Sequence, residues 1–127
     1  MSASPPTTVD RTTVEFPAGA EFRSVGRLVL GGVASRFELP IDRVDDLLLA
    51  VESVLLQTSA SSSVRVEAEA TAAGLRVRLS PFSVDELASP ALRRVLDRLV
   101  DEVVERPDGD ASAVELHVGA SYRGGRA

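Results

Sequence analysis

Residues 64–79 read VRVEAEATAAGLRVRL, and this stretch decides which fold the sequence predicts. Apolar residues alternate with charged ones over 64–69 and again over 75–79, and the small residues of 71–74 separate the two runs. Such alternation is typical of strands that bury one face and leave the other in water. We therefore predict a β-hairpin whose outer face carries arginine and glutamate opposite each other across the strands.

The charges on this outer face have both signs. Arg65, Arg76 and Arg78 share it with Glu67 and Glu69, so a mixed solvated surface is expected rather than a basic patch.

A helical pattern precedes the hairpin. Residues 41–58 place apolar side chains three and four positions apart, and Pro40 suits the first turn of a helix. Leu49 and Leu56 widen the apolar stripe, so this helix is expected at the centre of the core or beneath a second partner. The side chains predicted to be fully buried between the sheet and the preceding helix are Leu48, Val51 and Leu55.

The remaining elements follow from the same two periodicities. Residues 12–17 alternate as a strand that ends at Pro17, and residues 20–37 form an amphipathic helix. Ser83 and Glu86 have the spacing of a capping box, with Asp85 in the first turn of a capped helix.

Ser89-Pro90 marks the start of a longer helix, whose apolar face runs on to Val103. Residues 106–110 (RPDGD) then predict a turn, and residues 114–118 a last strand.

Together these elements predict an α/β two-layer sandwich, in which helices cover a mainly antiparallel sheet in the order β-α-α-β-β-α-β. One domain is expected over residues 11–119, between disordered tails at 1–10 and 120–127.

Composition excludes several classes of function. The chain has 127 residues with no cysteine and no lysine, so thiol nucleophiles, zinc–thiolate sites and a lysine Schiff base are ruled out. The net charge of −5 argues against binding nucleic acid. His117 is the only histidine, falls on the polar phase of its strand and is expected to be exposed, so no metal site is predicted. No apolar run approaches the ~20 residues of a membrane span, and we expect a cytoplasmic protein.

Residues 40–53 (PIDRVDDLLLAVES) resemble the second helix of the anti-sigma serine kinases. These are the small single-domain branch of the GHKL (histidine kinase-like, Bergerat-fold) ATPases, where this helix commonly reads LP-x-x-x-x-D-D-x-x-LAV-x-E-x-x-x-N. Residues 22–30 resemble the family's first helix, with Arg27 at its usual arginine. The resemblance covers residues 12–119. It implies a Bergerat-like fold and, as partner, a sigma factor or a STAS-domain anti-anti-sigma protein. Formation of a homodimer is also expected.

The nucleotide motifs of that family are altered here. Ser53 stands where family members carry the activating Glu, and Gln57 where they carry the Mg²⁺-binding Asn. Glu52 is a neighbouring carboxylate on a different helical face, interpreted as a solvated or interface residue. The alternative is a catalytic base, which needs a one-residue realignment that would put Leu56 at the Asn position. The family's glycine-rich loops are also missing, because no glycine occurs between Gly74 and Gly109. We therefore expect a retained fold, a degenerate nucleotide site, and no cofactor.

Three functions remain open at this point. The first is an anti-sigma-factor-like binding protein that works without ATP. The second is an ATP-dependent serine kinase with a divergent site, and the third is a pseudo-ATPase domain that only dimerises or supports another regulator. The resemblance places partner binding on the helix 20–37, where the candidate residues are Arg23, Arg27 and Arg36; the alternative is that these arginines form an ordinary solvated face.

Overall fold

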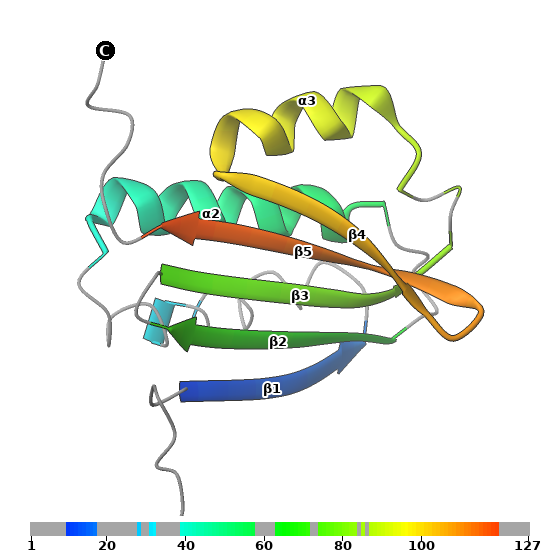
Figure 1. Cartoon of the computed structure of the whole chain (residues 1–127), viewed down its shortest axis with the longest axis horizontal. Coiled ribbons are helices and arrows are strands. Elements are labelled where there is room, and N and C mark those ends of the chain that lie inside the picture. The colour runs from blue at the N-terminus through cyan, green and yellow to red at the C-terminus, as the bar shows by residue number, and fades with distance from the viewer. Residues whose placement is uncertain are drawn as a thin grey trace, which may run out of the picture.

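The computed structural model describes residues 10–17, 28, 31–32, 39–57, 63–71, 74–83, 85 and 87–119. Within these residues, five antiparallel strands form one sheet in the order β1-β2-β3-β5-β4, and α2 and α3 cover one of its faces (Figure 1). The strands are β1 (Asp10–Pro17), β2 (Ser63–Thr71), β3 (Gly74–Phe82), β4 (Glu102–Asp108) and β5 (Ala111–Gly119); the helices are α2 (Ile41–Leu55) and α3 (Pro90–Leu99).

The predicted α/β two-layer sandwich is confirmed. The hairpin over residues 64–79 is β2–β3, in which Glu67 lies opposite Arg78 and Glu69 opposite Arg76. The edge strand β1 pairs with β2 from Asp10↔Ala70 to Pro17↔Ser63. The charged residues of these strands therefore share one face of the sheet, and the apolar residues share the other.

The C-terminal half of the chain contains a strand that the sequence pattern did not predict. The prediction of a helix reaching Val103, followed by a turn over 106–110, is wrong. Helix α3 ends at Leu99, and β4 pairs with β5 so that Val103 lies opposite Leu116. The turn is reduced to Gly109 and Asp110, and Gly109 has a φ of 61°, which favours glycine. Val103 belongs to the core from a strand, not from a helix.

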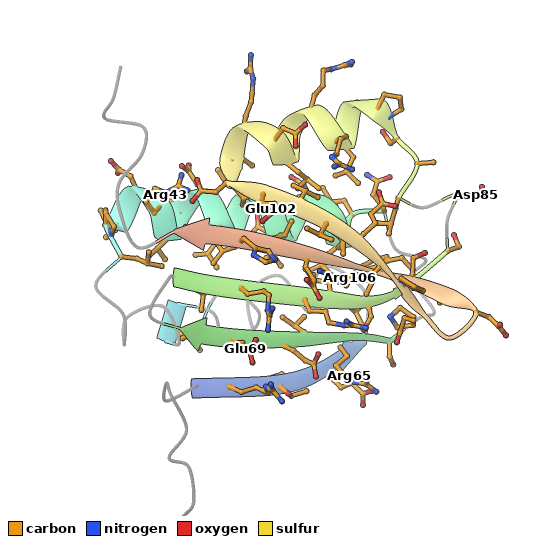
Figure 2. The ribbon with its side chains drawn as sticks, viewed as in Figure 1. Arg43, Arg65, Glu69, Asp85, Glu102 and Arg106 are labelled. Atoms are coloured by element: carbon orange, nitrogen blue, oxygen red, sulfur yellow. The ribbon has the colours of Figure 1, made fainter. Side chains whose placement is uncertain are left out.

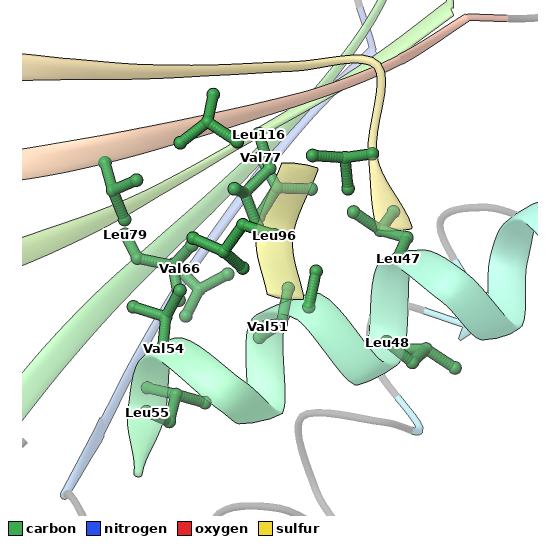
Figure 3. Packing of buried hydrophobic residues seen from close by; sticks show 14 of the residues in the cluster. Leu47, Leu48, Val51, Val54, Leu55, Val66, Val77, Leu79, Leu96 and Leu116 are labelled. Carbon is green, nitrogen blue, oxygen red and sulfur yellow. The ribbon is translucent and has the colours of Figure 1, made fainter. Parts of the chain in front are cut away.

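Helix α2 forms the centre of the hydrophobic core (Figure 3). It begins at Ile41, directly after Pro40. The predicted burial of Leu48, Val51 and Leu55 is confirmed, with exposed fractions of 7%, 2% and 8%, while the preceding helix against which they were predicted to pack lies largely outside the described residues. Leu49 and Leu56 are exposed, in agreement with a helix whose apolar stripe is wider than the face it buries.

Helix α3 begins where the sequence predicted. The Ser89 hydroxyl accepts a hydrogen bond from the Leu92 amide at 3.1 Å, and Pro90 occupies the first helical position, where no amide hydrogen is needed. Leu92 and Leu96, one turn apart, anchor the helix in the core.

The segment before α3 differs from its prediction. The described residues of 83–88 form turns rather than a capped helix, since the Ala88 amide donates to the Asp85 carbonyl at 3.2 Å and Leu87 turns into the core.

Several predictions fall on residues outside the described ranges. These are the tails at 1–9 and 120–127 and most of the predicted helix 20–37, including Arg23, Arg27 and Arg36. Of that helix the structure describes Leu28, Gly31 and Gly32, which are helical. Among the described residues, no helix is long and apolar enough to cross a bilayer.

Candidate functional site

Ser53 and Gln57, the two positions that the resemblance aligns with nucleotide-site residues, lie at the C-terminal end of α2. Ser53 is on the helix and donates a hydrogen bond from its hydroxyl to the Leu49 carbonyl at 2.8 Å. Gln57 follows the last helical residue, Leu55, and its amide donates to the Val54 carbonyl in a turn. A serine hydroxyl that donates to its own helix is no general base, and the Gln57 side chain starts just past the last helical residue.

The connection from β3 to α3 has side chains where a phosphate-binding loop would need glycine. Phe82 and Leu87 are both buried, with exposed fractions of 1% and 7%, and both belong to the main core. Asp85 is exposed in the turn between them (Figure 2). A phosphate is held by bare backbone amides at a glycine-rich helix start, and this connection is instead anchored by apolar side chains.

A buried ion pair joins the start of α2 to the sheet. The Arg43 side chain is 7% exposed, and its Nη2 donates to Asp101 Oδ1 at 2.8 Å. Asp46 Oδ2 lies 3.5 Å from Nη1 of the same guanidinium. The second oxygen of Asp101 accepts from the Gly119 amide at 2.6 Å. Asp101, which falls within the stretch predicted as a helix, therefore lies between α3 and β4 and ties α2 to the end of β5.

The open face of the sheet carries a network of ion pairs centred on β3 and β5 (Figure 2). Arg76 pairs with Glu69, which also accepts from Arg11 Nη2 at 2.7 Å. Arg78 has three carboxylates within 4 Å, those of Glu67, Asp108 and Glu115. The expected surface of mixed sign is confirmed, and its charges are paired with one another rather than separately solvated.

Glu115 is the most buried carboxylate of this network, with 5% of the residue exposed. Its Oε1 accepts from Arg106 Nε at 3.1 Å, and Arg78 Nη1 lies 3.5 Å from its Oε2. Burial, the largest single influence, raises the pKa of Glu115. Hydrogen bonding from Arg106 and His117 and the charges of Arg106 and Arg76 lower it, and together they hold the pKa below its usual value. Glu115 is thus an ionised structural carboxylate and is not available as a proton donor near neutral pH.

His117 is half-buried among carboxylates rather than exposed. Its Nδ1 lies 3.8 Å from Glu102 Oε1 and its Nε2 lies 3.5 Å from Glu115 Oε1. Within the described part of the chain, no group of three or more His, Asp or Glu side chains could hold a metal ion. His117 belongs to the ion-pair network of the open face.

A cavity of about 540 Å³ opens beside His117, where β3 begins and β5 ends. Arg76, Asp101 and Glu102 are among its lining residues, together with the backbone of Gly74 and Gly119. In its wall, Arg76 forms an ion pair with Glu69, and Asp101 forms one with Arg43. These two side chains therefore stabilise the fold.

Sequence reasoning missed the two polar clusters that organise the fold. The Arg43–Asp101 pair joins residues 58 positions apart, and no local pattern signals it. The role of Glu115 depends on Arg78 and Arg106 from the neighbouring strands, and the strand that carries Arg106 was not predicted. The alternation of charge in β2 and β3 was the one available signal.

Comparison with known proteins gives a partial similarity. Over 46 residues, or 36% of its length, the chain is 39% identical to the serine-protein kinase RsbW of Listeria monocytogenes serovar 1/2a. The same identity over the same length is found with the serine-protein kinase RsbW of Listeria innocua. The match spans 29% of the length of those proteins. No protein-family model matches the chain.

Proposed function

We propose that this chain is a cytoplasmic, anti-sigma-factor-like regulatory binding protein that sequesters a sigma factor or binds a STAS-type antagonist without using ATP. The observation that carries the proposal is the 39% identity to the serine-protein kinase RsbW, found on a sheet-and-helix sandwich of the expected kind. Homodimer formation is part of the proposal, and sedimentation velocity would measure it.

The binding role without catalysis is supported by the C-terminal end of α2. Ser53 has its hydroxyl bonded to the Leu49 carbonyl, and Gln57 lies past the helix. Kinase chemistry in the resembling family needs a carboxylate and an amide oxygen on one helical face. Ser53 supplies no carboxylate, and Gln57 keeps an amide oxygen but carries it one methylene further out than asparagine does. The connection between β3 and α3 is anchored in the core by Leu87, which supports a binding role without a phosphate-binding loop.

Arg23, Arg27 and Arg36 are the proposed partner-binding residues, on the ground of the family resemblance of residues 22–30. A planar guanidinium pairs with a carboxylate through two hydrogen bonds, which suits an acidic segment of the partner.

The alternative is an ATP-dependent protein serine kinase with a divergent site. The similarity to the Listeria proteins favours it, since they are serine-protein kinases. Glu52, a half-buried carboxylate one residue before Ser53, would then be the group to supply the base.

Calorimetric titration with Mg-ATP separates the two functions. We expect no heat of binding at millimolar nucleotide and no rise in melting temperature, because a ligand that binds the native state stabilises it by mass action. Capture of bound proteins from the native cytoplasm, followed by their identification, should then yield a sigma factor or a STAS-domain protein. Saturable ATP binding together with phosphate transfer to a serine of the captured protein would establish the kinase instead.

A further inference from the structure

Two of the described arginines differ from the others in their ion pairing. Nine arginines lie in the described residues, and seven have a carboxylate within 4 Å: Arg11, Arg43, Arg65, Arg76, Arg78, Arg93 and Arg106. Arg94 and Arg98, the other two, have no carboxylate partner within the described part of the chain. Both are exposed, and they lie one turn apart on α3.

These two arginines share the outer face of α3 with apolar side chains. Leu92 and Leu96 point into the core, so the residues on the opposite side of the helix point away from the sheet (Figure 2). Val95, between the two arginines in sequence and on the same side, is 41% exposed, and Ala91 is exposed one turn before it. We call Ala91, Arg94, Val95 and Arg98 the outer α3 face.

Arg98 lies in the last turn of α3, where the helix dipole favours a cation, but the residue one turn before it, Arg94, is also an arginine. Like charges one turn apart destabilise a helix slightly. Asp97, the acidic residue nearest in sequence, lies 3.5 Å from Arg93, and Arg93 also reaches Glu105 on β4. The carboxylates of Asp97 and Glu105 therefore lie near Arg93, and the two guanidinium groups of the outer α3 face have no carboxylate partner among the described residues.

We propose that the outer α3 face docks an acidic segment of a partner protein, one that presents two carboxylates about one helical turn apart around an apolar side chain. The two carboxylates would pair with Arg94 and Arg98, and the apolar side chain would cover Val95. This surface stands on α3 alone and does not depend on the proposed sigma-factor function.

Charge and chemistry favour a protein over a nucleic acid as the occupant. The chain carries a net charge of −5, and a nucleic-acid footprint needs a longer stripe of cations to neutralise several phosphates. An exposed valine at the centre of the face has no role against a phosphate backbone, whereas an apolar centre with a charged rim is the usual anatomy of a protein–protein contact.

The test is an NMR titration of the whole chain with a synthetic helical peptide that carries glutamates four residues apart around a leucine. We expect amide shifts concentrated on residues 91–98 and weaker binding in high salt. Arg94→Gln/Arg98→Gln should weaken peptide binding about tenfold, the sum of two exposed charge contacts. The matched control, Arg11→Gln/Arg65→Gln, removes the same charge from the open face of the sheet and should leave the affinity unchanged.

Three results would overturn the proposal. They are shifts concentrated on the open sheet face, an affinity that is the same in Arg94→Gln/Arg98→Gln as in the parent, and equal binding of a peptide with glutamine in place of both glutamates. Tighter binding of a single-stranded oligonucleotide to residues 91–98 would assign the face to nucleic acid and also contradict it. Circular dichroism melts of both double variants verify that the fold is retained.

Discussion

Arg43 and Asp101 form the polar link between the helical layer and the sheet. The guanidinium comes from the first turn of α2, and the carboxylate comes from the short connection between α3 and β4. Asp101 divides its two oxygens between Arg43, at 2.8 Å, and the Gly119 amide, at 2.6 Å. One carboxylate thus fixes the start of a helix and the end of a central strand at the same point.

Removal of either partner of this pair should destabilise the fold. Arg43→Met leaves the Asp101 carboxylate partly buried without its cation, and we expect a loss of about 2–3 kcal/mol. That value lies below the ~3–5 kcal/mol of a fully buried pair, because the Asp101 side chain is 23% exposed. Urea unfolding measures the loss. A double-mutant cycle with Asp101→Asn should give a coupling energy well above the ~0.5 kcal/mol limit of additivity, and a coupling near zero would contradict the link.

Neighbouring leucines on α2 provide a matched test of the core. Leu48 is 7% exposed and Leu49 is 46% exposed. Leu48→Ala should cost about 2–5 kcal/mol, because it removes a buried side chain and leaves a cavity. Leu49→Ala makes the same chemical change at an exposed position and should cost less than about 1 kcal/mol. Equal losses in the two variants would mean that α2 buries a different face.

Glu115 should make stability depend on acid pH. Its pKa in the folded protein lies below its usual value, so the unfolded chain binds the proton more readily. The stabilisation is therefore complete above the unfolded value of about 4.3 and is lost as the pH falls through the folded-state pKa. Glu115→Gln should cost about 1–2 kcal/mol at pH 7, since the Arg78 and Arg106 partners are partly solvated, and this cost should shrink toward pH 3.

Urea titrations of the two proteins between pH 7 and pH 3 measure this change. Glu102→Gln, on the adjacent strand with its side chain 63% exposed, is the control and should leave the stability nearly unchanged. A difference between Glu115→Gln and the parent that stays constant over this pH range would show that Glu115 does not titrate as described.

Arg27 tests the proposed partner surface. We expect Arg27→Ala to change the free energy of unfolding by no more than about 0.5 kcal/mol, because the sequence pattern places Arg27 on the polar side of its predicted helix. Its affinity for the identified partner should fall by about 1–3 kcal/mol, the range of an interface hot spot. Isothermal titration with the purified partner measures the change. If Arg23→Ala and Arg27→Ala both bind like the parent, the partner surface lies elsewhere.

Local patterns predicted the elements whose signals are local. The alternation in 64–79 gave both strands of the hairpin, and Ser89-Pro90 marked the first residue of α3 because a cap and a proline act within one turn. Strand β4 was missed for a physical reason. Val100 and Val103 continue the three-residue spacing of α3, while Pro107 and Gly109 resemble a turn. Pairing with β5 overrides that spacing, and pairing is a property of the whole sheet.

For the candidate site, the sequence indicates which positions to consider but not how their side chains are arranged. The resemblance singles out Ser53 and Gln57 from the residues alone, but the hydrogen bond from Ser53 to Leu49 and the end of α2 before Gln57 could not be predicted in that way. Likewise, nothing near Arg94 and Arg98 in sequence shows that they lack carboxylates, because the acids that might have paired with them are distributed by the tertiary fold.

The two edge strands each carry a proline, Pro17 at the end of β1 and Pro107 within β4. A proline has no amide hydrogen to offer an incoming strand, and both strands also expose charged side chains such as Arg11 and Glu105. Both edges of the sheet are therefore poor templates for aggregation. Pro107, which obscured β4 in the sequence, helps to keep the sheet at five strands instead of letting further chains extend it.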